Sequence, residues 1–149
     1  MKKGRYAVLL ISVLFAMISC MSSTNTVLSH GIDLSEYKYI VFGKDDKGDA
    51  ELDDIMMMLQ NELANKLVVL SPVKAQQLLD QGEKILSPRI NVKSEKWDGG
   101  HTYISISFYD FETNQNIAVV KSSGIGLSIN QDQKLSYSAI IKELKKVFK

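Results

Sequence analysis

The side chains best suited to acid–base or metal chemistry are few in this 149-residue chain. The two histidines, His30 and His101, lie far apart, and neither has a second histidine at the spacing of a metal site. The densest group of carboxylates runs from Asp45 to Asp54, but it lacks the alternating acids and the late glutamate of an EF-hand calcium loop. We therefore expect solvated histidines and a capped helix start, with no catalytic residue, no metal and no cofactor.

Two short motifs with glycine and serine also fall short of known chemistry. Gly124-Ile125-Gly126 is only half of a dinucleotide-binding fingerprint, and no phosphate-binding helix start follows it closely. Ser122-Ser123-Gly124 lacks the Gly-x-Ser-x-Gly elbow of hydrolases. A β-bulge or a bend in a strand is the simpler interpretation of this stretch.

Aromatic residues in the second half of the chain form the more informative candidate site. From His101 to Phe111 the sequence alternates, so one face of a strand carries Ile104, Ile106 and Phe108 and the other carries tyrosines beside serines. A half-aromatic, half-polar sheet face suits recognition of a protein or a glycan. The alternatives are a face that is merely solvated, or one covered by the N-terminal segment. The candidate partner-binding residues are Trp97, Tyr103, Tyr109 and Phe111.

The first twenty residues have the composition of an export signal. Lys2, Lys3 and Arg5 form a basic head, and an apolar run from Ala7 to Ile18 follows, interrupted only by Ser12. This run is too short to span a bilayer comfortably, which takes about 20 apolar residues, but it suits the hydrophobic region of a signal peptide. The basic head favours leaving that end in the cytoplasm, so we expect the rest to be exported.

The signal segment ends in Met17-Ile18-Ser19-Cys20, which resembles the lipobox of bacterial lipoproteins. The resemblance implies cleavage before Cys20, a diacylglyceryl group on its thiol, and an acylated new amino terminus, with palmitate among the expected chains. Cys20 is the only cysteine in the chain, and two acyl chains give a stable anchor. Met21 rather than aspartate then implies the outer membrane where the enteric sorting rule applies. Simple secretion and a retained membrane helix are the alternatives.

The chain that remains after residues 1–19 has the size of one domain. It carries 15 basic and 17 acidic residues, a net charge of −2, so it has no general attraction for nucleic acid. Without a second cysteine, its fold must be held by a hydrophobic core rather than by disulfides. We expect residues 1–19 to be the signal peptide, 20–33 a lipidated N-terminus and tether, and 34–149 a single α+β domain.

Hydrophobic periodicity gives that domain the predicted order β-α-β-α-β-β-β-α. Apolar residues three or four apart predict helices that begin near residues 52, 72 and 133, and alternating or β-branched stretches predict the strands. We expect a mixed sheet with the helices packed on one face. The predicted strands lie at residues 37–42, 68–70, 88–97, 101–111 and 117–121, the last resuming at 126–129.

This order resembles the small α/β domain shared by the outer-membrane lipoprotein LpoB, the curli secretion lipoprotein CsgG and the N-terminal domain of TolB. The matching stretches are Tyr39–Phe42, Leu63–Leu70 and Ile106–Asn114. The resemblance implies a non-enzymatic envelope role, such as activating a synthase, scaffolding an assembly or docking a partner.

The expected function is therefore a binding or assembly module that an acyl anchor holds on the cell membrane or outer membrane. Its domain would lie in the periplasm or at the cell surface, and its partner would be an envelope protein or a cell-wall glycan. The alternatives are an envelope hydrolase that uses aspartate or histidine residues, and a subunit of a ring or pore.

Overall fold

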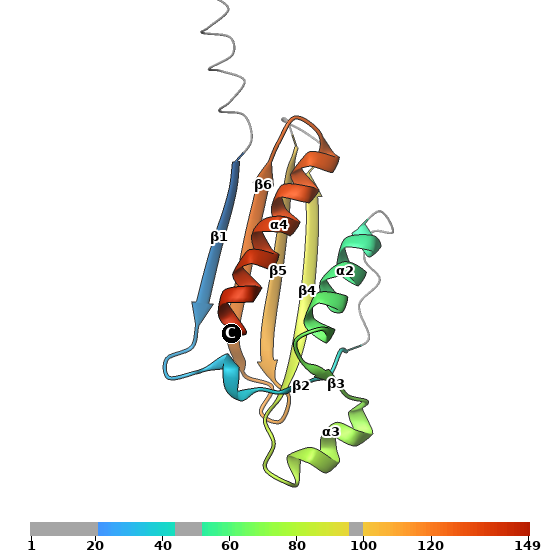
Figure 1. The fold of residues 1–149 in the computed structure, drawn as a ribbon, viewed down its shortest axis with the longest axis vertical. Coiled ribbons are helices and arrows are strands. Elements are labelled where there is room, and N and C mark those ends of the chain that lie inside the picture. The colour runs from blue at the N-terminus through green and yellow to red at the C-terminus, as the bar shows by residue number, and fades with distance from the viewer. Residues whose placement is uncertain (1–20, 44–51, 96–99) are drawn as a thin grey trace, which may run out of the picture.

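A computed structural model of the chain describes residues 21–43, 52–95 and 100–149, which are built on one six-stranded mixed sheet (Figure 1). The strand order is β1-β6-β5-β4-β2-β3; β2 is parallel to β3 and β4, and the other pairs are antiparallel. This confirms the predicted α+β class and the mixed sheet. The strands are β1 Met21–Leu28, β2 Tyr39–Ile40, β3 Val68–Val69, β4 Ile85–Glu95, β5 His101–Asp110 and β6 Asn116–Ile125.

The helices are the short 3-10 helix η1 Leu34–Glu36 and the α-helices α2 Asp53–Ala64, α3 Pro72–Leu79 and α4 Ile129–Val147. Helix α3 begins at residue 72, as predicted. The Ser71 hydroxyl caps it by accepting from the amide of Lys74 at 3.4 Å, and Pro72 opens its first turn. After the helix, Gly82 has a φ of 83°, and the amide of Glu83 donates to the carbonyl of Leu78 at 3.1 Å, which closes a Schellman turn.

The junction between β6 and α4 differs from the sequence expectation. Strand β6 runs without interruption to Ile125, and α4 begins at Ile129, four residues before the predicted start. Ser128 is the N-cap and accepts a hydrogen bond from the amide of Gln131 at 3.4 Å. Gly124 therefore lies within a continuous strand and not at a bend. Its lack of a side chain lets the first turns of α4 lie close against the sheet.

The main hydrophobic core lies between the sheet and the two helices α2 and α4, which cover the same face (Figure 1). The alternation predicted for β5 is confirmed, because its isoleucines and Phe108 are buried in this core. The ring of Phe148 meets Phe108 edge to face, with centroids 5.4 Å apart, so the end of the chain closes the core. The fully buried side chains here are Leu34, Ile40, Leu59, Leu63, Leu86, Ile104, Ile106, Phe108, Val120, Ile140 and Leu144.

Helix α3 packs on the opposite side of the sheet. It contributes Ala75 to a second cluster with Val41 and Ile85, whose neighbours in the strands, Ile40 and Leu86, belong to the main core. The reason is handedness. The chain moves outward from β2 to β3 and then back across β2 to β4, and right-handed crossovers in opposite directions require helices on opposite faces. The expectation of helices on one face therefore holds for α2 and α4 and is corrected for α3.

Strand β1 is the second correction. The sequence predicts a tether over residues 20–33, whereas Met21–Leu28 pair with β6 along their whole length. The Thr26 hydroxyl donates to Glu143 Oε1 of α4 at 2.9 Å, so β1 is also tied to the helix layer. Strand β1 provides hydrogen-bond partners for the backbone groups on the outer side of β6. Because β1 is an edge strand with little buried surface, its sequence can be polar.

Candidate functional site

The candidate site is the sheet face that α2 and α4 leave uncovered, here called the open face. It consists of outward-pointing side chains of four long strands, which lie in rows across the sheet. One row, for example, joins Lys93, Tyr103, Ser123 and Ser23. The open face comprises Arg89, Asn91, Lys93 and Glu95 of β4, His101, Tyr103, Ser105, Ser107 and Tyr109 of β5, Val119, Lys121, Ser123 and Ile125 of β6, and Met21, Ser23, Asn25 and Val27 of β1.

Two contacts hold the aromatic rings of the open face in defined orientations. The guanidinium carbon of Arg89 lies 4.5 Å from the ring centroid of Tyr109, a cation–π contact across two strands. The rings of His101 and Tyr103 stack with centroids 6.0 Å apart and planes 7° apart. Tyr103 is 42% exposed. The open face therefore presents ordered aromatic surface beside hydroxyl and amide groups, which suits a ligand that is both apolar and polar.

The charge of the open face is opposite in sign to the net charge of residues 20–149, which is −2. It carries three basic side chains, Arg89, Lys93 and Lys121, and one acidic side chain, Glu95, so its net charge is +2 with histidine neutral. Lys93 and Glu95 form an ion pair at 3.1 Å, which leaves Arg89 and Lys121 as the excess cations. A net positive charge favours an acidic partner over a basic one on this face.

The structure brings only part of the predicted site together. Tyr103 and Tyr109 lie on the open face as expected. Phe111 points to the same side of the sheet but packs against the cluster under α3, so it is a core contact rather than a free ring. Trp97 and the lipidation residue Cys20 lie outside the described residues, and their roles stay predictions.

Several residues of the open face are absent from the sequence prediction. The residues of β1 fall within the predicted tether. Arg89 and Lys121 are isolated charged residues within strands, and no sequence motif identifies them. For β1 a signal existed, because Thr24, Thr26 and Val27 are β-branched and favour a strand. The position of Arg89 over Tyr109 follows from strand register, which the sequence alone does not fix.

The hydrolase alternative needs histidine, a carboxylate and a nucleophile in one place. His101 is half-exposed and stacked on Tyr103, and the cross-strand Glu95 has its carboxylate on Lys93. Within residues 21–43, 52–95 and 100–149, no three histidine, cysteine, aspartate or glutamate side chains are grouped as a metal site would need. The carboxylate beside His101 belongs to the exposed Lys93–Glu95 ion pair.

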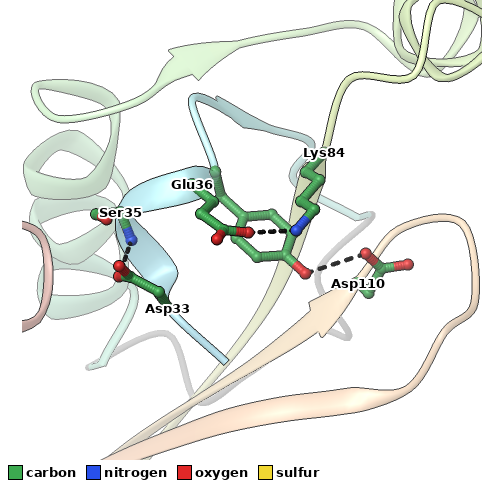
Figure 2. A network of polar contacts seen from close by, with 6 residues as sticks. Asp33, Ser35, Glu36, Lys84 and Asp110 are labelled. Carbon is green, nitrogen blue, oxygen red and sulfur yellow. Dashed lines mark hydrogen bonds and ion pairs between the residues drawn. The ribbon is translucent and has the colours of Figure 1, made fainter. Parts of the chain in front are cut away.

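A separate polar cluster, shown in Figure 2, joins η1 to the ends of β4 and β5. Lys84 pairs with Glu36, and the Tyr37 hydroxyl donates to Asp110 Oδ2 at 3.2 Å. Burial, strengthened by the negative charge of Asp110, raises the pKa of Tyr37 to about 12. Asp110 Oδ1 also accepts from the amide and the hydroxyl of Thr113, at 2.8 and 2.9 Å. These bonds fix the turn after β5, so we assign the cluster a structural role.

In the part of the chain that the structure describes, none of the helices has the length and apolar character needed to cross a bilayer.

Known proteins share the fold but not a recognisable sequence. No family model and no curated protein matches the chain. Two solved structures of PelC from Paraburkholderia phytofirmans, both dodecamers, are similar with TM-scores of 0.51 and 0.52 at 12% and 14% identity. They cover 86% of this chain and 98% and 99% of their own. A minor lipoprotein from Acinetobacter baumannii aligns with a TM-score of 0.36 at 16% identity, over 75% of this chain and 90% of its own. At these identities, the PelC likeness shows the fold alone.

Proposed function

We propose that the protein is a non-enzymatic binding module of the bacterial cell envelope, held on its membrane by an acyl anchor at Cys20. Its open face binds an acidic envelope partner, and the partner that fits best is an acidic cell-wall glycan. The observation that carries the proposal is the arrangement of ordered tyrosine rings between excess cations on a sheet whose other face is buried. Tyrosine rings pack against sugar faces, while serine and asparagine side chains serve hydroxyl groups.

The test is co-sedimentation of the detergent-solubilised lipoprotein with purified cell-wall sacculi. An aromatic contact contributes about 0.5–1.5 kcal/mol beyond the contribution of the apolar area that it buries. Tyr103→Ser should therefore weaken binding by up to about tenfold. Lys121→Ser should weaken it less and should reduce its sensitivity to salt. The matched controls are Val73→Ser on α3, which is 74% exposed, and Lys145→Ser on the outer side of α4; both should bind as the wild type does.

The outcomes separate the partner classes. If Tyr103→Ser and Lys121→Ser sediment like the two controls, the assignment of the open face is wrong. If the wild type does not sediment with sacculi but a cross-linker placed at Ser105 captures an acidic envelope protein, the face is right and the glycan is wrong. Activity of the wild type toward the glycan itself, measured by the release of soluble fragments, would contradict the non-enzymatic part of the proposal.

The anchor is tested by intact mass and detergent partitioning of the wild type beside Cys20→Ser. We expect the wild type to have the mass of residues 20–149 plus its acyl chains and to partition into detergent. The Cys20→Ser variant should lack the acyl chains. A bare mature chain, or an intact first segment, would refute the anchor and favour a secreted or helix-anchored protein.

A ring subunit is the second candidate, and the dodecameric state of the structurally similar PelC supports it. The sheet also ends in β1, an eight-residue edge strand whose outer side has no strand partner among the described residues. Such an edge can pair with another copy. The solubilised lipoprotein would then be a stable oligomer by light scattering and native mass spectrometry; a monomer at micromolar concentration would refute this candidate.

A further inference from the structure

Four large apolar side chains are exposed together at one end of the sheet. Met21 begins β1 and is the register partner of Ile125 at the end of β6. Leu127 follows in the connection to α4, and Ile129 is the first residue of α4; the connection lies at the upper end of the domain in Figure 1. Their exposed fractions are 63% for Met21, 37% for Ile125, 76% for Leu127 and 38% for Ile129. We call these four residues the apolar end.

The connection that carries these side chains has few groups that require water. The amide of Gly126 donates to the carboxylate of Asp132, and the amide of Leu127 donates to Gln131 Oε1 at 3.0 Å. From Ile125 to Gln131 the sequence contains no charged residue, and Asp132 is fully buried. The amides of Gly126 and Leu127 are therefore satisfied internally, which lowers the cost of moving this part of the connection from water to an apolar medium.

The same hydrogen bonds keep the apolar side chains pointing outward. A close approach of the chain to α4 reinforces them, because a Cβ placed on Gly126 would come within 2.9 Å of both Asp132 Oδ1 and the Gln131 side chain. The connection thus packs closely against the first turn of α4 and leaves Leu127 exposed. Exposure of a single apolar residue is ordinary, but four neighbours held in this way form a patch.

The place of the apolar end in the chain decides what it faces. Cys20 directly precedes Met21, the first residue of β1, and consecutive Cα atoms are about 3.8 Å apart, so the strand begins one residue after the proposed anchor site. No tether of any length separates them. An acylated Cys20 therefore draws Met21, and with it the neighbouring Ile125, to the surface of the bilayer.

We infer that the apolar end inserts its side chains into the lipid surface beside the acyl anchor, so the domain stands on the membrane in a fixed orientation. The inference rests on the proposed anchor and adds a second, non-covalent membrane contact. Helix α3 lies at the opposite end of the molecule and would be farthest from the lipid (Figure 1). Because acyl chains alone give stable attachment, simple membrane partitioning cannot report this contact.

The test therefore places a probe in the full lipoprotein. Since the only native cysteine is consumed by the anchor, Leu127→Cys provides one free thiol for an environment-sensitive dye, and Val73→Cys on α3, at a site 74% exposed, provides the matched control. Each labelled protein is reconstituted into vesicles of phosphatidylethanolamine and phosphatidylglycerol, with and without spin-labelled lipid. We expect the emission at position 127 to shift to the blue and to be quenched at least twofold more than at position 73.

Intact mass of each sample distinguishes the two proposals. An acylated protein whose two probes are quenched equally refutes the membrane contact and leaves the anchor in place. A chain without acyl groups whose probe at 127 is still quenched by lipid refutes the anchor and keeps the contact, and one that shows no quenching refutes both. A blue-shifted probe at 127 that lipid does not quench identifies a second copy of the chain as the occupant, which also overturns the inference.

Discussion

Replacing Gly124 by alanine should loosen the seam between the sheet and α4. A Cβ at this position would lie 2.7 Å from the amide nitrogen of Ser136 and 2.9 Å from Leu135 Cβ, and still closer to the carbonyl oxygen of Asp132. Favourable contacts of carbon atoms lie at about 3.5–4.0 Å, so the first turns of α4 must move outward by roughly 1 Å. Backbone atoms make up two of the three contacts, so a side-chain rotation cannot relieve them.

The movement also strains two buried hydrogen bonds in the same seam. The Ser122 hydroxyl donates to the carbonyl of Ser136 at 2.8 Å, and the Ser136 hydroxyl donates to the carbonyl of Thr102 at 2.6 Å. Overpacking costs about 1–3 kcal/mol and a weakened buried hydrogen bond about 1 kcal/mol more. The lower entropy of the unfolded alanine chain offsets about 0.4–1 kcal/mol. The net loss is about 2–3 kcal/mol.

The assay is thermal unfolding of the solubilised protein, followed by circular dichroism. For a domain of this size, 1 kcal/mol corresponds to roughly 4 °C, so Gly124→Ala should lower Tm by about 8–12 °C. Gly43→Ala is the matched control, because no heavy atom lies within 4 Å of the Cβ it would add and its φ is ordinary. It should change stability by less than about 1 kcal/mol. Equal Tm values for the two variants would refute the close approach of α4.

Three further changes test the charges and the core. Burial raises the pKa of Tyr37 from 10.0 to about 12. The contribution of the neutral Tyr37 to the free energy of unfolding is therefore complete below pH 10 and is lost toward pH 12. Urea unfolding should show this loss of stability in the wild type and a smaller loss in Tyr37→Phe. Hydrogen bonds from Lys146 and Thr26 hold the pKa of Glu143 below its ordinary value, so their stabilisation disappears as the pH falls through the lowered pKa. The protection factors of the β1 amides, which correct exchange rates for their intrinsic pH dependence, should fall in that range, and Thr26→Val should lower them at neutral pH. Leu144→Ala, at a fully buried site, should cost about 2–5 kcal/mol in urea unfolding, and a loss below 1 kcal/mol would contradict its place in the core.

The buried half of the fold is the part that periodicity predicts. Ile104, Ile106 and Phe108 recur at every second position, and Leu59 and Leu63 recur at helical spacing, because burial against one layer selects apolar residues at one period. Strand β3 and the start of α3 were also predictable, since Ser71 and Pro72 act through local hydrogen bonding and a fixed φ. Such signals need no knowledge of distant neighbours.

The parts that sequence reasoning missed depend on tertiary pairing. Strand β1 buries little, so it has no apolar alternation, and its partner β6 lies about 100 residues away. The face that α3 covers follows from the order β4-β2-β3 in the sheet, which is not readable from α3 itself. For the same reason, the sequence alone does not distinguish Phe111 from Tyr103 and Tyr109 of the open face. Phe111 packs against the cluster under α3, residues 72–79, which is distant from it in the sequence.

The position of β1 links the anchor to the open face and gives the binding proposal a direction. From the level of His101, which lies next to the apolar end, to Tyr109 the strand β5 rises by eight residues, or roughly 27 Å at about 3.4 Å each. If the apolar end sits in the lipid, Arg89 and Tyr109 lie farther from the membrane than Tyr103 does, and α3 lies beyond them (Figure 1). Among the cations of the open face, Arg89 would then lie closest to a cell-wall layer parallel to the membrane. Arg89→Ser should therefore weaken sacculus binding more for vesicle-bound protein than for detergent-solubilised protein, in which the partner approaches from any side. An equal effect of Arg89→Ser on vesicle-bound and detergent-solubilised protein would mean that the membrane does not hold the domain in a fixed orientation.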